Sequence, residues 1–151
     1  MNRDFVEMLS ALCEAGADYL VVGAHAMAAH GRPRATGDLD LWVRSSRENV
    51  ERVWAALERF GAPLQDLTME DLVAAEIVIQ IGVSPNRIDI LTSITGVSFQ
   101  EAWANRIEVR IEGITVPVLG RDELIRNKRA VGRPRDLADI EELQEAEQGE
   151  A

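Results

Sequence analysis

The sequence predicts an α+β fold in which a mixed β-sheet is flanked by helices, with further helices at the C-terminal end. Three observations favour this class. The chain of 151 residues has the length of one domain, and its 46% hydrophobic and 28% charged residues are the balance of a globular protein with a core. Short apolar runs alternate irregularly with segments of helical periodicity. Several of these runs are adjacent, which favours a mixed sheet over a purely parallel one.

The first quarter of the chain shows the clearest alternation. Apolar residues recur at helical spacing over 3–15, and Gly16 ends this amphipathic helix. The apolar run 19–22 lies between two glycines and predicts a buried strand. The small residues of 24–30 predict a short helix, and Pro and Gly in 32–37 predict a loop.

The rest of the chain continues the same mixture. The pattern predicts a strand at 38–43, a helix from Ser45 or Ser46 to about Phe60, and a short helix at 69–75 capped by Thr68. Strands at 77–82 and 87–91 follow, and then a short helix after Ser98. The last predicted elements are a hairpin of 106–111 and 114–118 and helices at 121–131 and 136–147. No linker divides these elements, so 1–151 is expected to be one domain with a helical C-terminal segment over about 121–147.

Composition excludes several classes of protein. With 26 acidic and 16 basic residues the net charge is −10, which argues against a broad nucleic-acid-binding face. The single cysteine, Cys13, cannot form an internal disulfide and is expected to be a small buried residue. The sequence has no apolar run long enough to cross a membrane and no signal-peptide pattern at its start, so no membrane partner and a cytoplasmic location are expected.

Two acidic residues stand in the strand predicted at 38–43. Asp38 and Asp40 are two residues apart, so in a strand their carboxylates lie on one face, roughly 6–7 Å apart. Leu39 and Leu41 point to the opposite face. Like charges held this close repel one another, and a divalent cation relieves that repulsion. Carboxylate oxygens are the ligands that Mg²⁺ prefers, with Mn²⁺ as the alternative ion.

A third acid, Asp89, lies between two isoleucines in the strand predicted at 87–91. An acid among apolar strand residues faces solvent, a charged partner or a metal ion. If this strand lies beside 38–43, the three carboxylates converge. The alternative is a simple ion pair of Asp89 with Arg87 or Arg106.

Gly23 and Ala24 stand where the first predicted strand ends and the short helix begins. A glycine at such a turn lets a phosphate approach the backbone closely, and the N–H groups of the helix start can bind its oxygens.

Together these motifs resemble the nucleotidyltransferase superfamily of the DNA polymerase β type. The family pattern is a strand ending in Gly-Ser or Gly-Gly, then Asp-x-Asp or Asp-x-Glu, then an acid on a later strand. Here it stands as Gly23-Ala24, Asp38-Leu39-Asp40 and Asp89. The likeness covers most of the chain, is strongest to small bacterial members, including those of toxin–antitoxin and abortive-infection systems, and extends to the run 127–139. Ala24 departs from the pattern, which usually has Ser or Gly at this position. Its backbone N–H is kept, but a hydroxyl that could bond phosphate is absent.

The resemblance implies a polymerase β-type fold and a two-metal transfer of a nucleoside monophosphate from an NTP to a hydroxyl. Asp38, Asp40 and Asp89 would hold the Mg²⁺ ions, and Asp89 would help to deprotonate the attacking hydroxyl. Basic and polar residues that could contact the triphosphate are Arg32, Arg34 and Thr36 before the acid pair and Lys128 on a C-terminal helix. The alternative for these four is a solvated surface.

Three hypotheses about function and partners follow. In the first, the chain is the enzyme described above, and its acceptor could be a protein, an RNA end or a small molecule. The acidic surface disfavours a large RNA. A second hypothesis is a nucleotidyltransferase-fold binding module with little or no turnover, acting as an antitoxin or regulatory subunit, and Ala24 favours it. A third makes the chain one partner protein of a toxin–antitoxin pair, which is compatible with either of the others.

Overall fold

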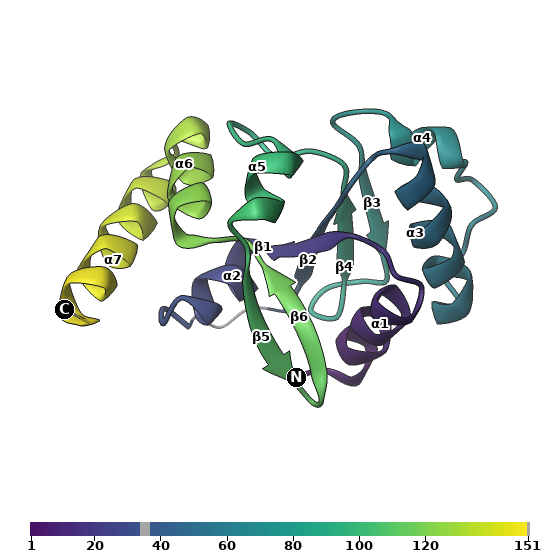
Figure 1. Ribbon diagram of the computed structural model, residues 1–151, viewed down its shortest axis with the longest axis horizontal. Coiled ribbons are helices and arrows are strands. Elements are labelled where there is room, and N and C mark those ends of the chain that lie inside the picture. The colour runs from purple at the N-terminus through teal and green to yellow at the C-terminus, as the bar shows by residue number, and fades with distance from the viewer. Residues whose placement is uncertain (34–36, 151) are drawn as a thin grey trace.

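Figure 1 shows the computed structural model of the protein, which describes residues 1–33 and 37–150. In chain order the elements are α1 (Arg3–Glu14), β1 (Tyr19–Val22), α2 (Gly23–Ala29), β2 (Leu39–Val43), α3 (Arg47–Phe60), α4 (Met69–Val73), β3 (Val78–Ile81), β4 (Ile88–Leu91), α5 (Phe99–Ala104), β5 (Ile107–Ile111), β6 (Ile114–Val118), α6 (Arg121–Val131) and α7 (Pro134–Glu150).

The strands of the described residues form one six-stranded sheet in the order β3-β4-β2-β1-β6-β5. Strand β2 pairs parallel with β4 and antiparallel with β1, and β1 pairs parallel with β6. The two edge pairs, β3 with β4 and β5 with β6, are antiparallel. The sheet is therefore mixed, as the irregular order of the sequence predicts, and its two central strands are buried along almost their whole length.

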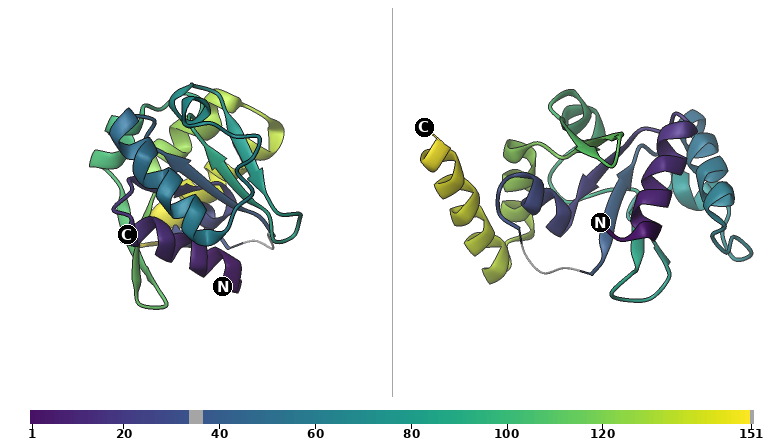
Figure 2. Two further views of the ribbon diagram at one scale, coloured as in Figure 1. Left: turned by 90° about the vertical axis from the view of Figure 1, so that its right-hand side faces the viewer. Right: turned by 90° about the horizontal axis from the view of Figure 1, so that it is seen from below.

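Helices lie at both ends of the molecule. Figures 1 and 2 show α1 beside α3 at one end and α6 beside α7 at the other. The stripe of α3 at Val50, Val53 and Leu57 is buried in the common core. Ser46 caps this helix by accepting a hydrogen bond from the Asn49 backbone N–H, so the second of the two predicted caps is the one used.

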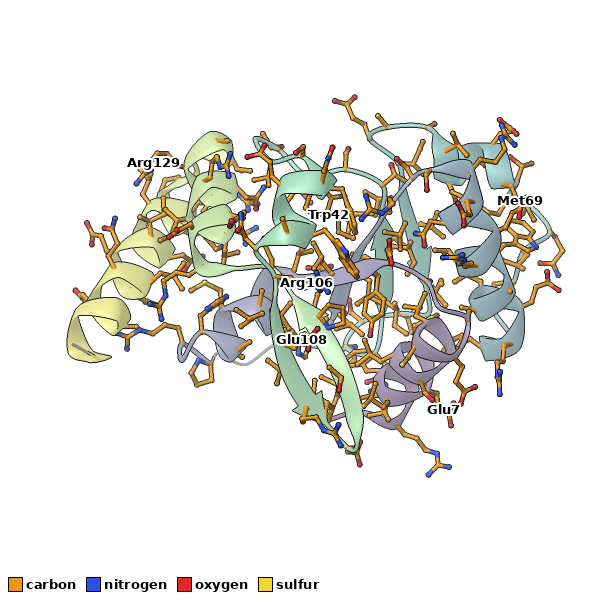
Figure 3. All side chains as sticks on the ribbon, in the orientation of Figure 1. Glu7, Trp42, Met69, Arg106, Glu108 and Arg129 are labelled. Carbon is orange, nitrogen blue, oxygen red and sulfur yellow. The ribbon has the colours of Figure 1, made fainter. Side chains whose placement is uncertain are left out.

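Aromatic contacts attach α5 to the sheet. The ring of Phe99 meets buried Trp42 of β2 edge to face, with their centroids 5.0 Å apart. Phe99 also stacks on Trp103, and the guanidinium of Arg106 lies 4.0 Å from the Trp103 ring centroid. Figure 3 shows Trp42 and Arg106 at the centre of the molecule, where α5 meets the sheet. Trp42 and Trp103 therefore serve packing.

The start of α7 and the exposure of Cys13 differ from the sequence predictions. Helix α7 begins at Pro134, two residues before the predicted start, because a proline is well suited to the first turn of a helix, where its missing N–H leaves no bond unmade. Cys13 is exposed, so the prediction that it is buried is wrong. The buried face of α1 comprises Phe5, Met8, Leu9, Ala11 and Leu12, and Cys13 lies on the helix side that faces solvent.

No helix among the described residues is both long and apolar enough to cross a membrane.

An ion network joins α6 to α7. The ammonium of Lys128 lies 2.8 Å from Asp139 and 3.7 Å from Asp136, and the Arg133 guanidinium lies 2.6 Å from Asp136. The side chains of Lys128, Asp136 and Asp139 are only 12%, 2% and 6% exposed. The hydrogen bond from Arg133 is the main reason why the pKa of Asp136 is lowered. These acids are thus buried as charged groups that depend on their cations.

Replacing Lys128 by alanine should therefore destabilise the protein by about 3 kcal/mol, because Asp139 and Asp136 stay buried with less compensating charge. Urea unfolding measures this change. The matched control is Arg126→Ala, which removes an ion pair with Glu101 whose partners are 45% and 53% exposed and should lower stability by less than about 1 kcal/mol. Equal effects of the two substitutions would contradict the account.

Candidate active site

The three predicted acids lie at one end of the β2–β4 pair. In the parallel ladder Asp40 is directly opposite Asp89, on strands that lie about 4.8 Å apart. Asp38 precedes β2 by one residue and lies two residues from Asp40, and therefore belongs to the same face. Leu39 and Leu41 point to the opposite face and are fully buried. This buried alternation fixes the register and with it the position of the acids.

The proximity of these acids changes the ionisation of Asp40. Burial, then the charges of Asp89 and Asp38, and finally a hydrogen bond with the Asp89 carboxyl raise the pKa of Asp40 to about 6. The nearby charge of Arg87 lowers it and offsets only part of the rise. Asp40 and Asp89 thus lie within hydrogen-bonding reach of each other, and the site carries excess negative charge.

Arg87 bridges the acids. Its Nε donates to Asp89 Oδ1 at 2.9 Å, and its Nη2 lies 3.2 Å from Asp38 Oδ2. The sequence offers an ion pair of Arg87 with Asp89 as the alternative to a catalytic role for Asp89. The structure shows this ion pair, and it also places Asp89 opposite Asp40. The Arg-x-Asp spacing indicates this pair, because residues two apart in extended backbone have their side chains on one face.

Ser84 is a second partner of Asp38 that the sequence analysis missed. Its hydroxyl donates to the Asp38 carboxylate, with the two oxygens at 3.1 and 3.0 Å. The turn between β3 and β4 brings Ser84 here, because Pro85 approaches Gly37 so closely that a Cβ on residue 37 would overlap the proline. No local sequence motif predicts this contact, because it joins two loops that are far apart in the sequence.

Gly23 opens the site on the β1 side. Its φ is +66°, and a Cβ at this position would lie well inside van der Waals contact with the Asp40 carboxylate. Glycine is therefore required here for two reasons, the positive φ and the close approach of the Asp40 side chain. Gly23 and Ala24 form the first turn of α2, and the helix has no side-chain cap. Its first N–H groups lack partners within the helix.

A pocket of about 510 Å³ lies beside Asp38. Residues from four segments line it, among them Phe5, His25, Gly37 and Pro85. The His25 ring packs edge-on against Phe5, with centroids 5.8 Å apart, and hydrogen-bonds to the Asp38 backbone. Burial lowers the pKa of His25 despite this bond. The pocket thus offers a neutral imidazole and an aromatic wall next to the Asp38 backbone.

Two of the predicted phosphate-binding residues, Arg32 and Lys128, contact α7. Arg32 donates from Nε to the Glu142 backbone oxygen of α7 at 2.9 Å, so it ties the loop after α2 to the C-terminal helix. Lys128 faces Asp136 and Asp139 between α6 and α7, where its charge is already compensated. Arg34 and Thr36 lie outside the described residues.

Comparison with known proteins identifies the architecture. No protein-family model matches the chain, and no curated protein sequence matches it. Among solved structures, the chain is similar to TM1012 from Thermotoga maritima, provisionally assigned as a nucleotidyltransferase, with a TM-score of 0.63 and 14% identity over 95% of this chain and 91% of that one. It is also similar to the lincosamide antibiotic adenylyltransferase LnuA bound to lincomycin, with a TM-score of 0.60 and 14% identity over 95% and 96% of the two chains.

The chain has the nucleotidyltransferase fold. The predicted fold class, a mixed sheet with flanking helices and C-terminal helices, is therefore confirmed. These likenesses cover nearly the whole length of both neighbours, so the fold extends through α6 and α7 as well as the sheet.

The carboxylates of this nucleotidyltransferase fold suit a divalent cation in charge and donor chemistry. All three offer oxygen, the ligand type of Mg²⁺, and the raised pKa of Asp40 reports negative charge that a cation would offset. Within 1–33 and 37–150, no three Asp, Glu, His or Cys side chains are gathered as they would be around a metal ion. The reason at this site is that Asp38 turns to Arg87 and Ser84 while Asp40 turns to Asp89.

Gly23→Ala should lower stability and displace Asp40, because it adds both a strained φ and a clash. We expect a loss of about 2 kcal/mol or more in urea unfolding. Gly16→Ala is the matched control, since Gly16 has a φ of +70° and nothing lies within 4 Å of its added Cβ. Equal losses at both positions would show that the close approach to Asp40 is unimportant.

Asp40→Asn should raise the melting temperature in EDTA at pH 8. The pKa of Asp40 is raised to about 6 from an ordinary 3.8, so its ionisation destabilises the folded state fully above pH 6 and not at all below about pH 4. The gain from the amide should therefore shrink as pH falls through 6. Asp66→Asn, in an exposed turn, should give no comparable gain. A pH-independent gain would contradict the assignment.

Proposed function

We propose that this chain is a metal-dependent nucleotidyltransferase that transfers a nucleoside monophosphate from an NTP to a hydroxyl acceptor. The observation that carries the proposal is the placement of Asp38, Asp40 and Asp89 on the neighbouring β2 and β4 segments, with Asp40 against Gly23, in a nucleotidyltransferase fold. Like charges at this spacing are unfavourable for a protein that uses them only as surface acids. They are suited to a site that gathers cations and phosphates.

The proposed reaction is a displacement at the α-phosphorus of the NTP. The acceptor oxygen forms a bond to the α-phosphorus of the NTP, the bond from that phosphorus to the bridging oxygen breaks, and pyrophosphate leaves. Asp38, Asp40 and Asp89 would hold one or two Mg²⁺ ions, with Mn²⁺ as the alternative, and the bound cation would supply charge neutralisation and acidify the hydroxyl. Asp89, the most buried of the three acids, is proposed to take the hydroxyl proton.

The triphosphate is proposed to lie against the first turn of α2. Gly23 and Ala24 carry no large side chain there, so the backbone N–H groups stay accessible to phosphate oxygens. Arg32, Arg34 and Thr36, which precede Asp38 in the sequence, and Lys128 on α6 are the proposed additional phosphate contacts. Arg32 and Lys128 would have to leave the partners that they have on α7.

A small-molecule hydroxyl is the acceptor that we favour over a protein side chain or an RNA end. LnuA is described as a lincosamide antibiotic adenylyltransferase with lincomycin bound, and its length is nearly matched by this chain. A domain of this size is therefore sufficient to hold a small acceptor. The pocket of about 510 Å³ beside Asp38 has the volume for one. The net charge of −10 disfavours a long RNA.

A second candidate is a binding module of the same fold without turnover, acting as an antitoxin or regulatory subunit. Two observations favour it: Ala24 replaces the residue that would carry a hydroxyl, and Arg87 already pairs with two of the acids. A role as one partner of a toxin–antitoxin pair fits either candidate and stays a prediction.

The decisive experiment incubates the protein with each of the four α-³²P-labelled NTPs and Mg²⁺ or Mn²⁺, once with a panel of hydroxyl-bearing small molecules and once with cell lysate. We expect label on a small molecule. The double variant Asp38→Ala with Asp40→Ala should transfer label at least about a thousandfold more slowly, because it lacks two of the residues that would hold the cation.

Asp66→Ala is the matched control and should keep full activity, because Asp66 lies in an exposed turn. Calorimetry with each NTP and Mg²⁺ completes the test. Binding without transfer would favour the second candidate. No metal-dependent binding of any NTP would overturn the proposed function.

A further inference from the structure

Arg87 occupies the position between two of the three acids. It pairs with Asp89 at 2.9 Å and with Asp38 at 3.2 Å, and it is 30% exposed while these partners are 12% and 27% exposed. Its second contact with Asp89, from Nη2 to Oδ2 at 3.3 Å, makes this pair two-pronged. Both oxygens of Asp89 and one of Asp38 are therefore engaged by one guanidinium.

The backbone ladder fixes this position. The Leu39 N–H donates to the Arg87 carbonyl at 3.0 Å, and Leu39 is the partner of Ile88 in the ladder, so Arg87 stands across from Asp38. Arg87 stands directly before β4 and two residues before Asp89, and in extended backbone this spacing puts both side chains on one face. The guanidinium thus reaches one acid on each strand without leaving the sheet surface.

We propose that Arg87 is a positioning residue that holds Asp38 and Asp89 together before a divalent cation binds and competes with that cation for the same carboxylate oxygens. The inference rests on the proposed function, since it concerns how the proposed metal ligands are kept in place. Without Arg87 three carboxylates face one another with no cation, and with it the incoming metal must displace the guanidinium. Arg87 therefore stabilises the metal-free protein and weakens metal binding.

Two effects of opposite sign distinguish this role from a merely structural one. Arg87→Gln should lower the melting temperature in EDTA and should tighten binding of Mn²⁺ about tenfold, because a charge-assisted contact no longer has to be broken. Arg87→Lys, which keeps the charge but not the two-pronged geometry, should give intermediate values of both.

Arg44 provides a matched control. It is 29% exposed and pairs with Asp18 at 2.9 Å, and Asp18 is 32% exposed. It stands just past the end of β2 opposite to the acids, so Arg44→Gln removes a comparable ion pair far along the strand. It should lower the melting temperature but leave the Kd for Mn²⁺ unchanged.

The experiment titrates metal-free wild type, Arg87→Gln, Arg87→Lys and Arg44→Gln with MnCl₂ by calorimetry and measures each melting temperature in EDTA. Tighter Mn²⁺ binding by Arg87→Gln, or by Arg87→Lys if the glutamine variant does not fold, supports the inference. Equal or weaker binding by both Arg87 variants beside a wild type that binds Mn²⁺ overturns it and leaves the proposed function standing. Absence of Mn²⁺ binding in wild type and variants alike overturns both.

Discussion

The parallel pairing of β2 with β4 is the constraint on which the site depends. It places Asp40 opposite Asp89 on a partly buried face of the sheet, where two carboxylates repel each other and lose hydration. Leu39 and Leu41 on the opposite face are fully buried, so the strand cannot slip by one residue to relieve this repulsion. The hydrophobic core thus holds the acids in an electrostatically unfavourable arrangement, which is how many proteins keep functional groups ready for a ligand.

The surroundings of the acids reduce this repulsion without removing it. Arg87 supplies a positive charge, and Ser84 a hydroxyl, from the same side of the sheet. Gly23 leaves the space into which the Asp40 carboxylate fits. Each of these residues is held by elements other than β2: Arg87 precedes β4, Ser84 lies in the turn before it, and Gly23 begins α2. The site is therefore a product of the sheet order as a whole.

Much of this arrangement could be predicted from the sequence. Alternation in 38–43, and apolar periodicity, small residues or turn residues elsewhere, predict the helices and strands found among the described residues, because each is a local pattern that burial reinforces. The convergence of Asp89 with the acid pair could be stated only as a condition, since strand order depends on packing of the whole chain. The contact of Ser84 with Asp38 and the burial of Lys128 against Asp139 join distant segments and leave no local signal. Cys13 was misjudged because its helix position alone decides its exposure.

The most direct test of the account is to locate a metal ion in crystals. Crystals grown with Mn²⁺ and a non-hydrolysable NTP would show Mn²⁺ by its anomalous scattering. The account predicts a peak in contact with carboxylate oxygens of Asp38, Asp40 and Asp89, with the Arg87 guanidinium moved off Asp38 and the triphosphate beside Gly23. A nucleotide bound elsewhere, or Mn²⁺ bound away from these acids while Arg87 still pairs with Asp38 and Asp89, would contradict it.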